Sequence, residues 1–269
     1  MARCFGITCD ALSYCLVAPF TRKTAHTFAH GALIASHAEH YVNAFDKKNA
    51  AIAHLASVTR ETLQKAVDRR GSAMLALSGG ATPRHYLPAI LAMDLDWSSI
   101  TLALTDERWV PPDHQDSNER MIKSLVSGTA AAQAQFIPLW QTDSSPEEAA
   151  KLASRTARKS GLEIDCVLLG MGMDGHIASL FAAHPTLNSQ QAYWISTPKP
   201  PAPNAPYRRI SLSPRALLKA HRICLVLMGS AKQEVWRKTW YDSNKHHEWP
   251  VRLLNAHDNL LTICLPEAE

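Results

Sequence analysis

Short apolar runs that alternate with helical patterns are the feature that most restricts the fold of this chain. The runs are five or six residues long, and between them apolar residues recur every three or four positions. Short runs without polar alternation are typical of strands buried on both faces. Strands alternating with helices build a mostly parallel sheet with helices on both faces, so we predict a doubly wound α/β fold. The expected strands are residues 73–77, 100–105, 165–169, 209–213, 223–228 and 260–265.

The expected helices fill the intervals between these strands. One begins near Asp116, because Asp116 and Glu119 have the spacing of a capping box. We predict a single domain over residues 39–269 and a poorly ordered extension over residues 1–38, whose apolar patch is too short and interrupted for a membrane span. The other helices are expected at residues 45–70, 83–93, 146–159, 214–220 and 230–240, with a short one from about residue 177.

Composition narrows the classes of partner. The net charge is only +4 and 19% of residues are charged, which is far from the concentrated basic field of a nucleic-acid-binding domain. The cysteines include no C-x-x-C pair, and those inside apolar strands are typical of buried reduced thiols. We therefore predict a cytoplasmic protein with no nucleic-acid or membrane partner.

Two glycine-rich turns follow predicted strands. Ser78-Gly79-Gly80 follows residues 73–77, and the segment 170–175 follows residues 165–169. Glycine lets the backbone approach a ligand, and the free N–H groups of a following helix attract an anion. For Ser78-Gly79-Gly80, a tight turn without a ligand is the alternative. The second turn matches G-x-G-x-x-G, but no acidic residue stands about twenty positions further on, where a dinucleotide-binding protein needs one.

Charged residues stand beside these turns. Asp106, Glu107 and Arg108 come straight after a buried strand, where they need partners. Arg108 either binds a phosphate or carboxylate or pairs with its acidic neighbours. Lys232 stands in the first turn of a predicted helix, where the dipole favours an anion, so it either meets a bound anion or points into solvent. With Arg209 as a further cation, these residues predict a pocket for a small phosphorylated metabolite.

His176 is the candidate base. It follows the second glycine turn directly, at the start of the helix expected from residue 177. A helix N-terminus disfavours imidazolium, so we expect a neutral, basic histidine near pH 7. An exposed turn histidine without function is the alternative.

Four segments together resemble the 6-phosphogluconolactonase family, within the glucosamine/galactosamine-6-phosphate isomerase superfamily. The resemblance covers about residues 40–265 and does not extend to residues 1–38. Two positions differ from the lactonase pattern: Ile177 stands in place of threonine, and Glu119 stands where an aromatic residue commonly follows Ser-Asn. The segments are LSGGATP (77–83), DERWVP with DSN (106–111 and 116–118), GMGMDGHIASLF (170–181), and RISL with GSAK (209–212 and 229–232).

The resemblance implies a fold related to glucosamine-6-phosphate and ribose-5-phosphate isomerases. It also implies hydrolysis of 6-phosphoglucono-δ-lactone to 6-phosphogluconate, in the oxidative pentose phosphate pathway, without metal or organic cofactor. His176 would activate the attacking water, with Arg108 and Asp174 as the other catalytic residues. The substrate-binding residues that it implies are Gly79, Gly80, Asp106, Asn118, Arg209 and Lys232.

Two other functions stay open at this point. A deaminase or aldose–ketose isomerase acting on an amino sugar phosphate needs a carboxylate base, for which Asp106 is the candidate. A sugar-phosphate-binding module without catalysis would keep the pocket but would not need His176. We also expect the proline-rich loop 198–206 to close over the substrate.

Overall fold

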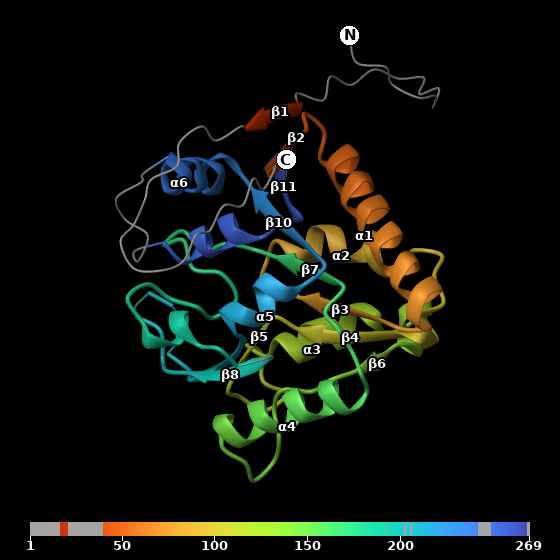
Figure 1. Ribbon diagram of the computed structural model, residues 1–269, viewed down its shortest axis with the longest axis vertical. Helices are drawn as coiled ribbons and strands as arrows, with labels where there is room; N and C mark the ends of the chain where they lie inside the picture. The colour runs from red at the N-terminus through yellow and green to blue at the C-terminus, as the bar shows by residue number, and fades with distance from the viewer. Residues whose placement is uncertain are drawn as a thin grey trace, which may run out of the picture.

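The main sheet is built from strands in the order β1-β2-β11-β10-β7-β3-β4-β6 (Figure 1). The computed structural model describes residues 17–20, 40–191, 193–201, 203–204, 206–241 and 249–267. Neighbouring strands pair in parallel except β1, which is antiparallel to β2. The strands are β1 (Val17–Phe20), β2 (His40–Ala44), β3 (Ala73–Leu77), β4 (Ile100–Leu104), β6 (Gln135–Phe136), β7 (Cys166–Leu169), β10 (Arg222–Met228) and β11 (Leu260–Leu265).

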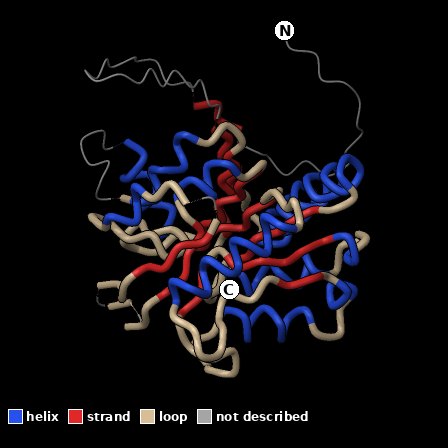
Figure 2. The backbone as a smooth tube through the Cα atoms, turned by 60° about the horizontal axis from the view of Figure 1, so that its bottom comes forward, coloured by secondary structure: helices blue, strands red, loops and turns tan. Residues whose placement is uncertain are grey.

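Helices cover both faces of this sheet, as predicted. From β2 through β3 and β4 to β6 the chain moves one way across the sheet, and from β6 through β7 and β10 to β11 it moves back. Right-handed crossovers place the helices of the two passes on opposite faces, and Figure 2 shows the strands between helices. The helices are α1 (Lys48–Arg70), α2 (Pro83–Leu91) and α3 (Asn118–Val126) on the outward pass, and α4 (Pro146–Lys159), α5 (Pro214–Lys219) and α6 (Ser230–Tyr241) on the return. Short 3₁₀ helices occupy Trp97–Ser99, Ala130–Gln133, Pro185–Asn188 and Pro250–Ala256.

Local sequence explains where several of these elements begin and end. All residues of β3, β4, β7 and β11 are buried, which accounts for apolar runs interrupted only by Thr101 and Thr262. Helix α1 ends at Gly71, which adopts φ 72° and donates its N–H to the carbonyl of Val67 at 2.7 Å. Helix α4 begins with a capping box between Ser145 and Glu148.

A second, three-stranded antiparallel sheet was only partly predicted. It has the order β5-β9-β8, with β5 (Asp106–Arg108), β8 (Trp194–Thr197) and β9 (Arg209–Leu212). Only β9 was expected, because β5 has three charged residues and no apolar run. The sheet joins the end of β4 through a hydrogen bond from the N–H of Leu212 to the carbonyl of Thr105 at 2.7 Å. Helix α4 packs against β8 and β9.

The predicted N-cap of α3 was wrong by one residue. Ser117, not Asp116, is the N-cap, and its hydroxyl accepts the N–H of Arg120 at 3.1 Å. Glu119 makes an ion pair with Lys123 at 2.6 Å instead of closing a capping box. The first turn has another acceptor for its free N–H groups, the carboxylate of Glu107, which the sequence pattern does not reveal.

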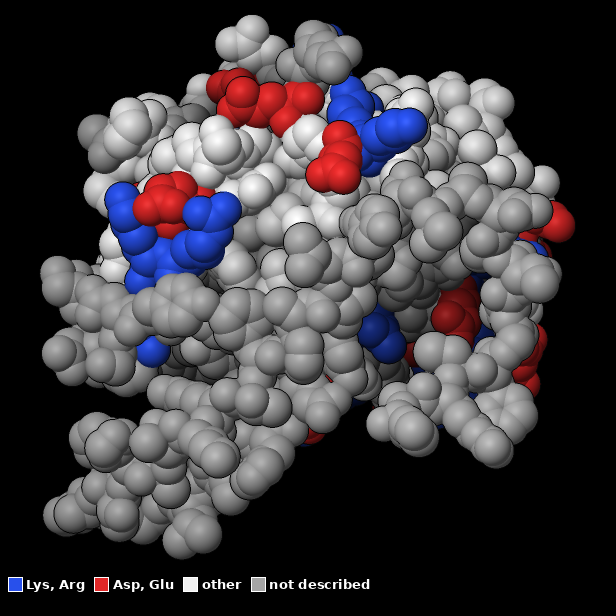
Figure 3. Space-filling view, turned by 90° about the horizontal axis from the view of Figure 1, so that it is seen from above, with Lys and Arg blue, Asp and Glu red and all other residues white. Residues whose placement is uncertain are grey.

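The surface and the chain start add two observations. Among the described helices, none has both the length and the apolar character needed to cross a membrane. On the face seen in Figure 3, acidic and basic side chains lie beside one another in small groups. Of the predicted extension 1–38, only β1 lies within the described residues, so its predicted disorder stays a prediction.

Candidate active site

The topological switch point of the sheet lies between β3 and β7. These strands are neighbours, and their outgoing connections run to opposite sides. A crevice at the carboxyl ends of such strands is the usual ligand site of an open α/β sheet. Ser78-Gly79-Gly80 follows β3 there, and the segment 170–176 follows β7; the N–H of Ser78 donates to the carbonyl of Leu168 at 3.1 Å. The two glycine turns predicted to form the site therefore lie side by side.

His176 does not stand at the start of a helix, and that prediction was wrong. Residues 177–180 form a turn in which Ile177 makes isolated β-bridges to Met171 and Leu180. Ala178 adopts φ 48°, a left-handed conformation that an α-helix does not accommodate. Ile177 is fully buried in the core, so its departure from the lactonase pattern lies away from the solvent-accessible site. A helix dipole therefore does not set the state of His176.

The carboxylate of Asp174 sets the tautomer of His176 instead. The Oδ1 atom of Asp174 lies 2.5 Å from Nδ1 of His176. Burial alone would raise the pKa of Asp174, but its hydrogen bond and charge interaction with His176 lower that pKa to about 2. The carboxylate is thus ionised near neutral pH and can only accept a hydrogen bond, so Nδ1 carries the proton. The lone pair of Nε2 is left to accept a proton from water.

Gly172 makes room for this pair. A Cβ atom at position 172 would lie 2.2 Å from the His176 ring and 2.6 Å from Oδ1 of Asp174. The N–H of Gly172 donates to the carbonyl of His176 at 2.9 Å, closing the turn. Glycine is therefore required here by contact with the two site residues.

A buried polar cluster lies beside the histidine, built on β5 and β9. Ser179 donates its hydroxyl to Oδ2 of Asp106 at 2.6 Å, and Nη1 of Arg209 lies 3.4 Å from Oγ of Ser179 and 3.9 Å from Oδ2 of Asp106. The other oxygen of Asp106 accepts from the hydroxyl of Thr105 at 3.2 Å. Both carboxylate oxygens of Asp106 are thus engaged within the protein, and the cluster holds the Arg209 guanidinium in place.

Two arginines lie next to each other on this small sheet. Arg108 and Arg209 are direct partners in the β5–β9 pairing, so their side chains share one face. Burial and the charge of Arg108 lower the pKa of Arg209, while Asp106 opposes the shift. Arg108 also donates to the carbonyl of Asp116 at 2.5 Å. The carboxylate of Asp106 offsets part of the repulsion between the two cations, and the face that they share is suited to a phosphate or a developing oxyanion.

The first glycine turn is held by Asn118. Its Nδ2 donates to the backbone carbonyl of Asp106 at 2.8 Å, and a Cβ at Gly79 would lie 1.8 Å from its Oδ1. Gly80 adopts φ 96°, which favours glycine. Asn118 thus connects the turn after β3 to strand β5.

Glu107 points to the other side of β5 and fixes α3. It is 1% exposed and accepts hydrogen bonds from the N–H groups of Arg108, Asn118 and Glu119 and from the hydroxyl of Ser117. Burial raises its pKa to about 7 against these four hydrogen bonds. Its role is to position the segment that carries Asn118.

Lys232 lies at the same edge of the sheet, in the first turn of α6 after β10. It is half-buried, burial lowers its pKa, and it makes no ion pair with any described residue. The alternatives for Lys232 were a bound anion and an ammonium that points into solvent, and its contact with a ligand stays a prediction.

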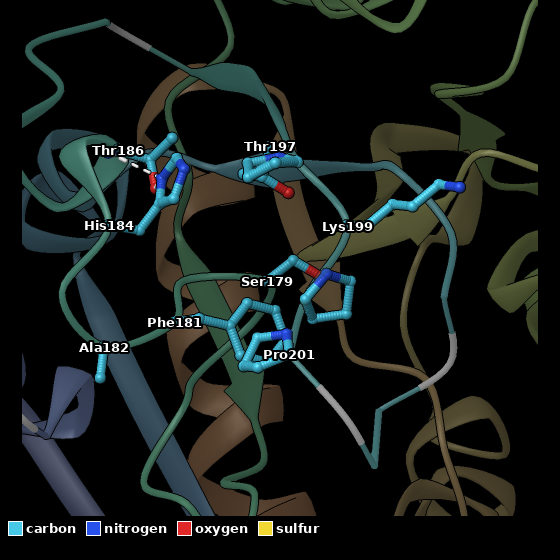
Figure 4. Close-up of a pocket in the computed structure, with 10 residues that line it drawn as sticks. Ser179, Phe181, Ala182, His184, Thr186, Thr197, Lys199 and Pro201 are labelled. Carbon is cyan, nitrogen blue, oxygen red and sulfur yellow. Dashed lines mark hydrogen bonds between the residues drawn. The ribbon is translucent and has the colours of Figure 1, made fainter.

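Ser179 and Phe181 belong to the site but were not predicted as site residues. The Phe181 ring centroid lies 4.5 Å from that of His176, and Cζ of Arg209 lies 5.6 Å from it. Both residues also line a hollow of about 60 Å³ that is partly open to solvent, and Figure 4 shows Phe181 near Pro201 of the proline-rich loop, whereas the Lys199 side chain points away. Their position in the segment ASLF, directly after His176, was the available indication. Within the described part of the chain, no three His, Cys, Asp or Glu side chains gather in a way that could hold a metal ion.

Comparison with known proteins decides the family. Residues 46–263 match the family described as glucosamine-6-phosphate isomerases/6-phosphogluconolactonase. The chain belongs to this family.

Relatives within the family are named as lactonases. The chain is 41% identical over 181 residues to a 6-phosphogluconolactonase of Pseudomonas aeruginosa, covering 66% of this chain and 76% of the relative. It is 35% identical over 214 residues to one of Rhizobium meliloti, covering 78% and 91%. The crystal structure of a 6-phosphogluconolactonase from Shewanella baltica superposes with a TM-score of 0.75 at 34% identity, over 84% of this chain and 97% of that one. A monomeric glucosamine-6-phosphate deaminase shares the fold, with a TM-score of 0.68 at 17% identity.

Proposed function

We propose that the protein hydrolyses 6-phosphoglucono-δ-lactone to 6-phosphogluconate, with His176 as the general base. The observation that carries this assignment is the Asp174–His176 pair at the switch point of the sheet, beside two adjacent arginines. The names of the relatives supply the substrate. We further propose that it acts in the cytoplasm, as part of the oxidative pentose phosphate pathway.

The reaction uses the free nitrogen of the imidazole. Nε2 of His176 takes a proton from water as the water oxygen bonds to the lactone carbonyl carbon. Asp174 keeps the proton on Nδ1 and stabilises the imidazolium that forms. The tetrahedral intermediate then collapses, the bond between the carbonyl carbon and the ring oxygen breaks, and the imidazolium returns its proton to that oxygen. A positioned base of this kind contributes about 10² to 10⁴-fold to the rate.

The cations hold the two anionic parts of the reactant. Arg108, Arg209 and Lys232 place three cationic side chains at the carboxyl ends of the strands, and Arg209 also lies 3.9 Å from the carboxylate of Asp106. These cations are suited to the phosphate, and the backbone N–H groups of Gly79 and Gly80 are suited to the oxyanion. We propose that these residues and Asn118 form the substrate site, with Asp106 acting through Arg209.

The deaminase alternative is not favoured. A carboxylate that abstracts a carbon-bound proton needs a lone pair directed at the substrate. Asp106 is only 7% exposed, and each of its oxygens already accepts one hydrogen bond from a protein hydroxyl group, at 2.6 and 3.2 Å, so its carboxylate is held by Ser179 and Thr105. The curated relatives cited above are also lactonases, whereas the deaminase likeness is one of fold alone.

The test is a lactonase assay of the parent, His176→Asn and His221→Asn, with spontaneous ring opening subtracted. His221 serves as the matched control because it directly precedes β10. It therefore lies at the amino ends of the strands, away from His176, and pairs with Glu163. We expect His176→Asn to lose at least about 100-fold in kcat and His221→Asn to match the parent. Unchanged turnover in His176→Asn would refute the base assignment. Ammonia release from glucosamine 6-phosphate, without lactone hydrolysis, would refute the proposed reaction.

A further inference from the structure

We propose that Phe181 is a positioning residue that holds the imidazole of His176 at the angle required for water activation. The proposal rests on the role of His176 argued above. It assigns a function to an apolar side chain that takes no part in the proton transfer or in binding the phosphate.

The imidazole is enclosed on two sides. Phe181 is 6% exposed, and its ring lies 4.5 Å from the His176 ring at an interplanar angle of 34°. Gly172 lies so close to the imidazole that even a Cβ there would be 2.2 Å from it. The hydrogen bond to Asp174 fixes one nitrogen but still permits the ring to swing about that contact. The flat phenyl surface removes this freedom.

The phenyl ring itself is held by Arg209. The guanidinium carbon lies 5.6 Å from the ring centroid, within the range of a cation–π contact. Arg209 is in turn fixed by Ser179 and Asp106, at 3.4 and 3.9 Å. The base is thereby connected through one aromatic ring to the most deeply buried cation of the site.

An aromatic ring is needed for this role, because volume alone does not provide it. Leucine would fill much of the space but has no flat face for the imidazole and no quadrupole for the guanidinium. Arg209 would keep its contacts with Ser179 and Asp106 without Phe181. The loss of the ring should therefore reduce kcat and leave KM nearly unchanged.

The experiment compares Phe181→Leu, Phe181→Met and Phe181→Tyr with the parent in the lactonase assay. Phe136→Leu is the matched control, since Phe136 lies in β6, the outermost strand of the sheet, away from the switch point between β3 and β7. A misplacement of about 1 Å costs on the order of 10²-fold, so we expect kcat to fall by about 10- to 100-fold in the leucine and methionine variants. Phe181→Tyr should restore kcat to within about threefold, because the residue borders the hollow, which can receive a hydroxyl. Phe136→Leu should match the parent.

Three outcomes would overturn the proposal. They are a kcat in both Phe181→Leu and Phe181→Met within about twofold of the parent, a rise in KM without loss of kcat, and a Phe181→Tyr variant as impaired as the leucine one. If His176→Asn is inactive while the Phe181 variants are active, only the present proposal fails. If His176→Asn is active, the assignment of the base fails.

Discussion

Gly172→Ala adds one methyl group beside the base and should nearly abolish turnover. Gly172 has no left-handed φ, so the backbone accepts alanine, and any effect must come from the new side chain. Its Cβ would lie 2.2 Å from Nδ1 and Cε1 of His176 and 2.6 Å from Oδ1 of Asp174. Non-bonded carbon atoms normally approach to about 3.5–4.0 Å. The imidazole must therefore move by about 1.5 Å.

That displacement sets the size of the effect. A shift of about 1 Å at a catalytic group costs on the order of 10²-fold, and the whole contribution of a general base is about 10² to 10⁴-fold. We expect kcat to fall within that range. The His176 side chain is partly exposed, so the free energy of unfolding should change by less than about 2 kcal/mol.

Gly170→Ala is the matched control. It is the same substitution two residues earlier in the same turn, and a Cβ at position 170 would meet no atom within 4 Å. Both variants would be assayed for lactone hydrolysis and for urea-induced unfolding. The reasoning is refuted if Gly172→Ala keeps more than about a third of the parent kcat, or if Gly170→Ala loses as much activity.

Two further predictions concern stability. Asp165 is 1% exposed, pairs with Arg70 and accepts the N–H of Met74 at 2.9 Å. Asp165→Asn should therefore lower the free energy of unfolding by about 3 kcal/mol without changing kcat. A loss of less than about 1 kcal/mol in urea denaturation would contradict this. The pKa of Asp174 is lowered to about 2 in the folded protein, so its stabilising contribution should be complete above about pH 4 and disappear as the pH falls toward 2. The stability difference between the parent and Asp174→Asn, measured by denaturation between pH 6 and 2.5, should narrow as the pH falls; a difference that widens would show that the sign is wrong.

Much of the fold follows from local patterns. Unbroken apolar runs predicted β3, β4, β7, β10 and β11, because strands buried on both faces need no polar alternation. The bounds of α4 and of β11 were predicted to the residue. A proline after a capping serine marks the start of α4, and Asn259 and Pro266 bracket the run of β11. Because parallel strands place their carboxyl ends at one edge, the glycine turns could be placed together from the sequence alone.

Contacts between distant residues decided the rest. Glu107 lies in β5 and accepts hydrogen bonds from the first N–H groups of α3. The cap at Ser117 could therefore not be inferred from spacing within 116–119. The pairing of Arg108 with Arg209 depends on β5, a strand too short and too charged to have a pattern of its own.

The sequence by itself determined the alternation of the central strands with helices, the two glycine turns and the presence of a histidine after the second. Only the tertiary structure decided how that histidine is oriented, because its carboxylate partner, the glycine beneath its ring and the phenyl group against it act through distances of a few ångströms. A turn with a left-handed alanine replaced the expected helix, and a hydrogen bond replaced the expected dipole. Spacing along a chain records which residues are near in sequence, whereas proton transfer depends on which atoms are near in space.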